Sequence, residues 1–312
     1  MLKEVVYYLL NMSIIATLIM MIVYLLRFIL SKRFSKNMIF LLWIFVLIRL
    51  LVPFAISSEL SVFSMFGEEL VRDVPIEIME NDKETQLVFS NTIAQANEYN
   101  PIVYKTSTFE RVIEVLSYIW LTGFVLLSLI GLIVTRRFIN NLKVTYLENV
   151  EKYNVYTSKV IKSPIVIGVI KPKIILPLEI DKQVKEYAII HEINHIKRHD
   201  NIWKALFTLA TLLHWFNPFC WLMLGQLSKD IELACDEKVI KSLSKEMIKE
   251  YALALVSANE DISNYAIAFS GNELESRIAG IVNYKKMTKF MMILMSIVYL
   301  VLCIVLMTNG LE

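Results

Sequence analysis

The sequence predicts a mainly α-helical integral-membrane protein with four transmembrane helices and one α+β domain that contains a small sheet. Three observations support this class: an apolar composition, four long apolar runs, and a polar middle segment that combines strand-like and helix-like patterns. Hydrophobic residues make up 56% of the 312 residues, and the mean hydropathy is +0.54. Soluble domains contain about 45–50% apolar residues, so the excess indicates segments that lie in lipid.

The four apolar runs have the length that a bilayer requires. Residues 5–26 are 22 positions without a charge, about 33 Å of helix at about 1.5 Å per residue, and a bilayer core is about 30 Å thick. Residues 39–56 are interrupted only by Arg49, while 115–135 and 290–308 carry no charge. The first run is too long for a cleaved export signal, and no Ala-x-Ala-like site follows it, so we expect a retained helix.

Basic residues in the short loops predict the orientation. Residues 27–38 contain four Lys or Arg and no acid, and Arg136 and Arg137 directly follow the third run, so both regions are expected in the cytoplasm. Residues 57–110 contain ten acids and three bases, which agrees with an extracellular position. The chain is therefore predicted in the cell membrane, with both termini extracellular.

These observations divide the chain into five parts. The expected order is transmembrane helices 1 and 2 in 1–56, an extracellular loop in 57–110, transmembrane helix 3 in 111–135, a cytoplasmic domain in 136–289 with a membrane-associated segment in 205–225, and transmembrane helix 4 in 290–308.

The cytoplasmic domain begins with residues 136–150, which look helical, and continues with a Val- and Ile-rich stretch in 154–177. Proline and glycine interrupt this stretch, which is typical of short strands at the edge of a sheet. An edge strand would allow an extended substrate to pair with the sheet, but a hairpin that only stabilises the fold explains the pattern equally well.

A helix with a metal-binding motif is expected after Asp181, which is a suitable N-cap. His191 and His195 lie one turn apart on one face of this helix, and Glu192 stands beside the first. In this H-E-x-x-H pattern two neutral imidazoles hold Zn²⁺ and the glutamate acts as general base towards water. A basic surface helix without a metal is the alternative.

His199 is a poor candidate for a third ligand. It is eight residues from His191, about 12 Å along a straight helix, and two imidazole–zinc bonds of about 2 Å cannot close that gap. We therefore expect it to be a polar residue on the same helix.

The better third ligand is Glu232, which lies 37 residues beyond His195. Asp236 is one turn later on the same face and can orient a ligand histidine by accepting its free N–H. Asp200 and Asp230 are weaker alternatives for these roles, and a solvated acidic helix is the alternative without a metal.

Residues 205–225 contain no Lys, Arg, Asp or Glu and are long enough for a fifth span. A simple crossing would place Glu232 on the opposite side of the membrane from His195, so the two could not share an ion. Asn217 and Pro218 interrupt the segment, and His214 is costly in lipid. We therefore expect a re-entrant or interfacial hairpin, in which His214 forms a structural hydrogen bond or steadies an oxyanion.

The remaining features limit the classes of partner. Two cysteines lie in the cytoplasmic segment and one in the last span, so no disulfide is expected. The sequence contains no nucleic-acid-binding signature, and we expect no direct contact with nucleic acid.

Taken in order, "SPIVIGVIKPKIILP", "IIHEINHIKRHDN", "HWFNPFCW" and "ELACDEKVI" resemble the membrane metalloproteases of the BlaR/MecR type, the β-lactam sensor-transducers of Gram-positive bacteria. The resemblance covers roughly residues 1–310. It implies a gluzincin-like zinc site, with ligand roles for His191, His195 and Glu232, the base role for Glu192 and a supporting role for Asp236.

The resemblance also implies a role in signalling. The cytoplasmic protease of this family cuts itself between the metal site and the last helix, and a transcriptional repressor is inactivated. In this chain the corresponding segment is 261–286, whose small polar residues suit an accessible loop, and self-cleavage is expected near Ala268, Phe269 and Ser270. An uncut linker is the alternative. The partners expected are membrane lipid and a cytoplasmic repressor as substrate, with a homo-oligomer left open.

One departure from the family leaves the stimulus open. Typical sensors continue beyond the fourth span into an extracellular penicillin-binding domain, whereas this sequence stops at Glu312. The expectation is a member without that sensor domain or a fragment from which it was removed, and otherwise a signal that arrives through residues 57–110 or through a partner. Whether β-lactams are sensed is left open. The alternative function is a non-catalytic membrane receptor or scaffold in which zinc only holds the fold.

Overall fold

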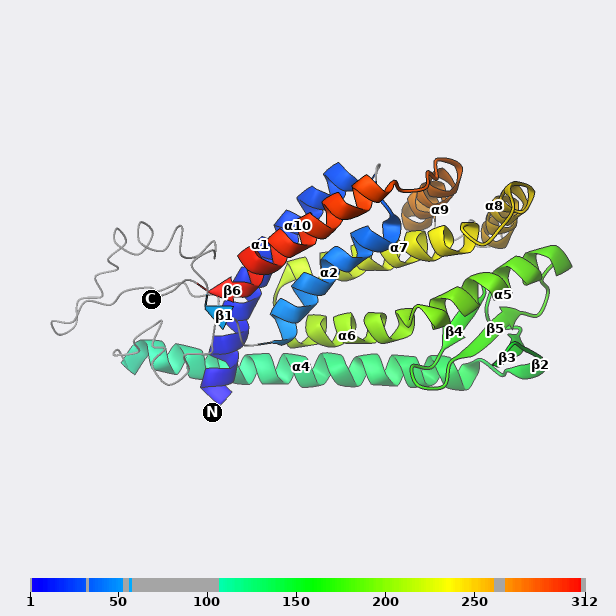
Figure 1. Cartoon of the computed structure of the whole chain (residues 1–312). Coiled ribbons are helices and arrows are strands. Elements are labelled where there is room, and N and C mark those ends of the chain that lie inside the picture. Colours follow the sequence, from blue (N-terminus) through cyan, green and yellow to red (C-terminus); the bar gives the residue numbers. More distant parts are fainter. Residues whose placement is uncertain (1, 32–33, 53–55, 58–106, 261–266, 310–312) are drawn as a thin grey trace.

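The computed structural model describes residues 2–31, 34–52, 56–57, 107–260 and 267–309. The described part is mainly helical, with a small sheet near one end and the long helix α4 along one side (Figure 1). The helices that pack in its apolar half are α1 (Leu2–Leu30), α2 (Lys36–Leu51), α4 (Ser107–Asn141) and α10 (Lys289–Met307).

Two of these helices, among the described residues, are long and apolar enough to cross a bilayer: Leu2–Leu30 and Arg111–Asn141. Helix α2 has 16 residues, about 24 Å, which is less than a bilayer core of about 30 Å. Helix α10 is also apolar but shorter than the two candidates. The predicted count of four spans is therefore supported for two helices and stays a prediction for the others.

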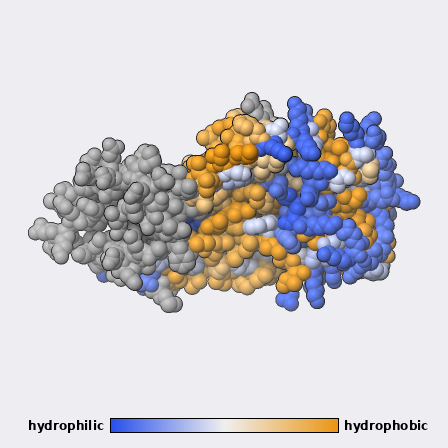
Figure 2. Space-filling view, in the orientation of Figure 1, coloured by the Kyte–Doolittle hydropathy of each residue, from blue (hydrophilic) through white to orange (hydrophobic). Residues whose placement is uncertain are grey.

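On the face seen in Figure 2, the described part has an apolar half and a half that is mainly polar. Many apolar side chains of α1, α4 and α10 are exposed, including Leu132 at 66% and Ile293 at 60%. Exposed apolar surface of this extent is unusual for a protein in water and agrees with helices that face lipid.

A small mixed sheet lies in the polar half. It contains β2 (Thr145–Val150), β3 (Tyr153–Ser158), β4 (Ile165–Ile167) and β5 (Lys173–Pro177) in the order β2-β3-β5-β4. Strands β3 and β5 are parallel, and the other pairs are antiparallel. Strand β4, which follows Pro164, is at an edge, as the sequence predicted, but β5, which ends at Pro177, lies inside the sheet. Residues 136–150 were predicted to be helical, which is wrong for β2, because α4 ends at Asn141.

Helix α5 (Lys182–Lys197) begins where the sequence predicted, since the Asp181 side chain accepts hydrogen bonds from Gln183 N and Val184 N. Ile189 and Ile193 pack on the buried side chains of β3 and β5. The predicted continuation through His199 is wrong. This residue has a left-handed backbone with φ of 58° and stands between α5 and helix α6 (Asp200–Leu213), so the chain changes direction directly after the motif.

The segment 205–225 forms the predicted hairpin. Helix α6 is followed by a short turn and helix α7 (Pro218–Ile240), with the Asn217 side chain capping α7 through Phe219 N. Contacts of Thr211 with Cys220 near the turn and of Lys204 with Glu232 far from it show that the helices run antiparallel. The expected structural hydrogen bond of His214 is present, from Nε2 to the Leu50 carbonyl oxygen.

Two further helices cover α7 and α5. Helix α8 (Lys245–Glu260) contacts α5, and helix α9 (Ile267–Val282) contacts α7 and α8. The region suggested for cleavage, Ala268 to Ser270, was expected in an accessible loop, but its backbone forms the start of α9. Its side chains and residues 261–266 lie outside the described part.

Candidate metal centre

Helix α5 brings two imidazoles together because it presents His191 and His195 on its buried side. Their Nε2 atoms are 3.0 Å apart, and the two rings are nearly perpendicular. Each residue is only 6% exposed. Two ring nitrogens at this separation can both direct a lone pair at a single cation.

Helix α7 adds a carboxylate to this pair. Oε2 of Glu232 is 3.3 Å from His191 Nε2 and 3.5 Å from His195 Nε2. Tetrahedral zinc with bonds of about 2.0–2.2 Å separates its ligand atoms by about 3.3–3.6 Å. The two distances to Glu232 lie in this range and the distance between the imidazoles is slightly shorter, so the three donors fit Zn²⁺.

Cys235 offers a different third donor. His191, His195 and Cys235 each have a potential ligand atom, and these three atoms lie within 4.8 Å of one another. The Cys235 sulfur, however, lies 3.7 Å from Nδ1 of His191, the nitrogen that faces away from Glu232, and it contacts the His191 carbonyl oxygen at 3.4 Å. Glu232 lines the cavity beside the histidines and Cys235 does not. We therefore take Glu232 as the third donor.

A cavity of about 370 Å³ opens beside the three donors. Glu192 is 8% exposed and lines this cavity together with His191 and His195. Ile165 and Val166 of the edge strand β4 also line this cavity. The centre therefore borders a space lined by a buried carboxylate and by the edge strand of the described sheet.

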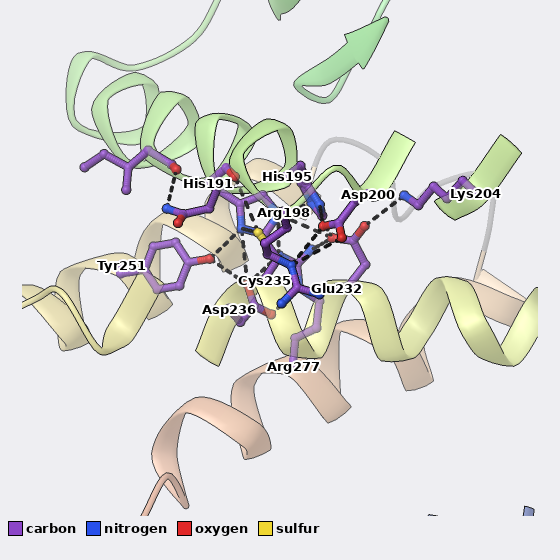
Figure 3. A network of polar contacts seen from close by, with 12 residues as sticks. His191, His195, Arg198, Asp200, Lys204, Glu232, Cys235, Asp236, Tyr251 and Arg277 are labelled. Atoms are coloured by element: carbon purple, nitrogen blue, oxygen red, sulfur yellow. Dashed lines mark hydrogen bonds and ion pairs between the residues drawn. The ribbon is translucent and has the colours of Figure 1, made fainter. Parts of the chain in front are cut away.

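The outer ring nitrogens of both histidines have partners that hold the rings in place (Figure 3). His195 Nδ1 is 2.7 Å from Oδ2 of Asp200, a residue that is 1% exposed. His191 Nδ1 is 2.8 Å from the Tyr251 hydroxyl, which donates to Asp236 at 2.6 Å. Asp236 is itself 3.3 Å from His191 Nδ1. Such partners select the tautomer that leaves Nε2 free for a metal.

Positive groups stabilise the two carboxylates of α7. Burial raises the pKa of Asp236, but Arg277 beside it holds this pKa well below its usual range. Burial likewise raises the pKa of Glu232, whereas Arg277 and, in their protonated form, the adjacent histidines hold it well below its usual range. Both carboxylates are therefore ionised at neutral pH, and Glu232 is available as a metal ligand.

The structure thus brings together all five residues that the sequence assigned to the site: His191, Glu192, His195, Glu232 and Asp236. It leaves His199 out, because the chain turns there. Asp200, considered only as a weaker alternative, contacts His195 directly. Asp230 faces the other way, towards Arg27 of α1.

Tyr251 and Arg277 are residues of the centre that the sequence did not indicate. Both line the cavity, but they come from α8 and α9, 60 and 86 positions beyond His191. No motif precedes either residue. The only local signal is their position on amphipathic helices, which many residues share.

Two imidazoles and a carboxylate converge beside a buried glutamate, on helices that pack against an apolar bundle. This arrangement is typical of membrane metallopeptidases. The family model "BlaR1 peptidase M56" matches residues 7–281, and the chain therefore belongs to this family.

Curated relatives agree with this assignment. The chain is 26% identical over 313 positions to the methicillin resistance mecR1 protein of Staphylococcus aureus strain Mu50, an alignment that covers 90% of this chain and 52% of the relative. The mecR1 protein of Staphylococcus epidermidis gives the same values. The regulatory protein BlaR1 of Bacillus licheniformis is 31% identical over 144 positions, 41% of this chain and 23% of the relative. The chain spans about half the length of the mecR1 relatives.

Proposed function

We propose that this chain is an integral-membrane zinc endopeptidase of transmembrane signalling. It cleaves itself and a cytoplasmic transcriptional repressor, and so induces antibiotic-response genes. The observation that carries the proposal is the convergence of His191 Nε2, His195 Nε2 and Glu232 Oε2 at the cavity that Glu192 also lines. The names of the relatives, a methicillin resistance protein and a regulatory protein, support the signalling role.

The residues divide the chemistry of peptide hydrolysis among them. A bound Zn²⁺ would polarise the scissile carbonyl and lower the pKa of the attacking water to about 7. Glu192 takes a proton from that water and delivers it to the departing amine. Asp200, Tyr251 and Asp236 keep the imidazoles in the tautomer that the site requires.

The position of the edge strand β4 favours a substrate that binds in an extended conformation. Among the described strands β4 pairs only with β5, and its Ile165 and Val166 line the cavity together with His191 and Glu192. A peptide that pairs with the free edge would therefore run past the catalytic groups, with backbone hydrogen bonds holding it regardless of its side chains.

The membrane arrangement proposed for this function has four spans, with the protease domain in the cytoplasm and both termini outside. The exposed apolar side chains of α1, α4 and α10 support insertion in lipid. In this arrangement the centre lies close to the inner leaflet, because the α6–α7 hairpin packs among α1 and α2 at its closed end and carries Glu232 at its open end.

A non-catalytic receptor with a structural zinc site is the second candidate, and the grouping of Cys235 with both histidines favours it. Structural zinc sites use four protein ligands, whereas catalytic sites use three and leave one position open. Glu192 and the cavity favour the catalytic function, because a structural site needs neither.

The test is the Glu192→Gln variant, purified in lipid nanodiscs beside the wild type. It retains all three donors, so zinc content should stay at one ion per chain while fragments of the chain and of an added candidate repressor disappear. Glu186→Gln, an exposed change on the same helix, is the matched control and should cleave like wild type. Identical fragment patterns from wild type and Glu192→Gln would exclude the protease function.

A further inference from the structure

Arg277 extends from α9 into the centre and is only 13% exposed at its side chain. Its Nε and Nη2 atoms donate to the two oxygens of Asp236, each at 2.8 Å (Figure 3). This two-point contact fixes the plane of the guanidinium, and it uses two of the five N–H donors that an arginine carries.

The N–H donors of Arg277 that do not bind Asp236 face His191 and Glu232. Nη2 lies 3.4 Å from His191 Nε2, and Nη1 lies 3.5 Å from Glu232 Oε2. The guanidinium therefore stands beside two of the three converging atoms and on the wall of the cavity. Its positive charge therefore borders the space that a substrate could enter.

A cation at the centre would change what Arg277 can bind. A neutral imidazole has one nitrogen lone pair, so His191 Nε2 cannot accept from Arg277 while it coordinates an ion. A donor on a largely buried cation that loses its acceptor is costly, and it is best satisfied by another oxygen. Arg277 lines the cavity, which has room for such an oxygen.

The other donors of the cavity wall are less suitable. The Tyr251 hydroxyl donates to Asp236 and is also bound to His191. Lys204 reaches only the outer oxygen of Glu232, at 3.4 Å, and its side chain is 40% exposed. Among the described residues that line the cavity, Arg277 is the cation that is both buried and held in one orientation.

We propose that Arg277 binds the carbonyl oxygen of the scissile peptide bond and stabilises the negative charge that develops on it. When water attacks, its oxygen forms a bond to the carbonyl carbon, the C=O electron pair moves to the oxygen beside Arg277, and a proton passes to Glu192. When the C–N bond breaks, that pair returns and Glu192 protonates the amine. The inference rests on the proposed function and assigns to it an oxyanion-binding residue.

The test compares Arg277→Lys and Arg277→Met with wild type, using zinc content, peptide cleavage and inhibitor affinity. The substrate is a quenched fluorescent peptide with the sequence of residues 261–276. Arg277→Lys keeps the charge near Asp236 but cannot make the two-point contact. We expect a loss of about 10²–10³-fold in kcat, the effect of removing one oxyanion donor, with KM and zinc content little changed. Arg137→Met, exposed on α4, is the control and should match wild type.

Affinity for two inhibitors separates this role from a structural one. A phosphinic peptide carries the tetrahedral anion that Arg277 would bind, whereas a neutral hydroxamate peptide depends mainly on the metal ion. Both Arg277 variants should lose at least about tenfold in affinity for the phosphinic peptide relative to the hydroxamate. Equal losses for both inhibitors, or a loss of zinc in both variants, would assign Arg277 a structural role and overturn the inference.

The same experiment separates this inference from the proposed function. If the wild type leaves the peptide and itself intact, the protease function fails, and the ratio of the two inhibitor affinities still tests Arg277. If the wild type cleaves and Arg277→Lys cleaves with the same kcat, the inference alone fails.

Discussion

Removing the carboxylate of Asp200 is expected to weaken zinc binding without removing a ligand. Its Oδ2 is 2.7 Å from His195 Nδ1, and the residue is 1% exposed, so no water replaces it freely in Asp200→Ala. Loss of such an outer partner lowers metal affinity about 10–100-fold. At about 1.4 kcal/mol for each factor of ten, this corresponds to about 1.4–2.8 kcal/mol.

The measurement is a competition for zinc between the nanodisc-embedded chain and a chromophoric chelator of known affinity. Asp200→Asn should fall between wild type and Asp200→Ala, because its amide oxygen can still accept from His195 without a charge. Glu186→Gln, exposed on α5, is the control for a lost carboxylate. Arg198 also contacts Asp200, at 3.1 Å, so thermal unfolding is followed in parallel. A zinc affinity of Asp200→Ala within threefold of wild type, at an unchanged Tm, would refute this account of His195.

Three further outcomes follow from the same geometry. Glu232→Ala removes the third donor and should leave the purified chain with far less than one zinc per molecule by elemental analysis; full occupancy would instead favour the donor set with Cys235. Chelation with EDTA should lower the Tm, since an ion at 100 times its Kd contributes about 2.7 kcal/mol, and an unchanged Tm would show that no ion stabilises the fold. Asp230→Ala removes a buried carboxylate that pairs with the partly exposed Arg27 and should cost about 2 kcal/mol in urea unfolding, whereas a change below about 0.5 kcal/mol would mean that water takes over the pairing.

Local patterns were sufficient to predict the part of the centre that lies on α5 and α7. His191 and His195 are four residues apart, as are Glu232 and Asp236, and this spacing places each pair on one helical face whatever surrounds it. The hairpin between them was also predictable, because Asn217 and Pro218 stop one helix and start the next. The two helical faces can meet at one ion if residues 205–225 form a hairpin and do not cross the membrane, as the sequence analysis predicted.

The remaining contacts depend on tertiary packing and could not be predicted from spacing. The turn at His199 requires a left-handed backbone at a residue that is not glycine. No local sequence pattern predicted this conformation. That turn is what brings Asp200 back to His195. Tyr251 and Arg277 reach the centre because α8 and α9 pack on α5 and α7, and their sequence neighbours resemble those of any amphipathic helix.

Helix α7 connects the centre to the apolar bundle, because its two sides bind different parts of the chain. Asp230 accepts from Arg27 and from Trp43 Nε1 at 2.8 Å, and Glu237 accepts from the Ser35 hydroxyl at 2.6 Å and from the backbone N–H of Lys36. These two carboxylates are seven residues apart, two turns of one face, and they hold α7 against α1 and the first turn of α2.

The opposite side of the same two turns carries Glu232 and Asp236. A helix is stiff over this length, so a rotation or shift of α7 relative to α1 and α2 also moves the Glu232 oxygen relative to the histidines of α5. A displacement of about 1 Å would exceed the tolerance of zinc–ligand bonds, which vary by about 0.2 Å. The position of the third donor is therefore set from the apolar half of the molecule, while the two imidazoles are set by the sheet on which α5 packs.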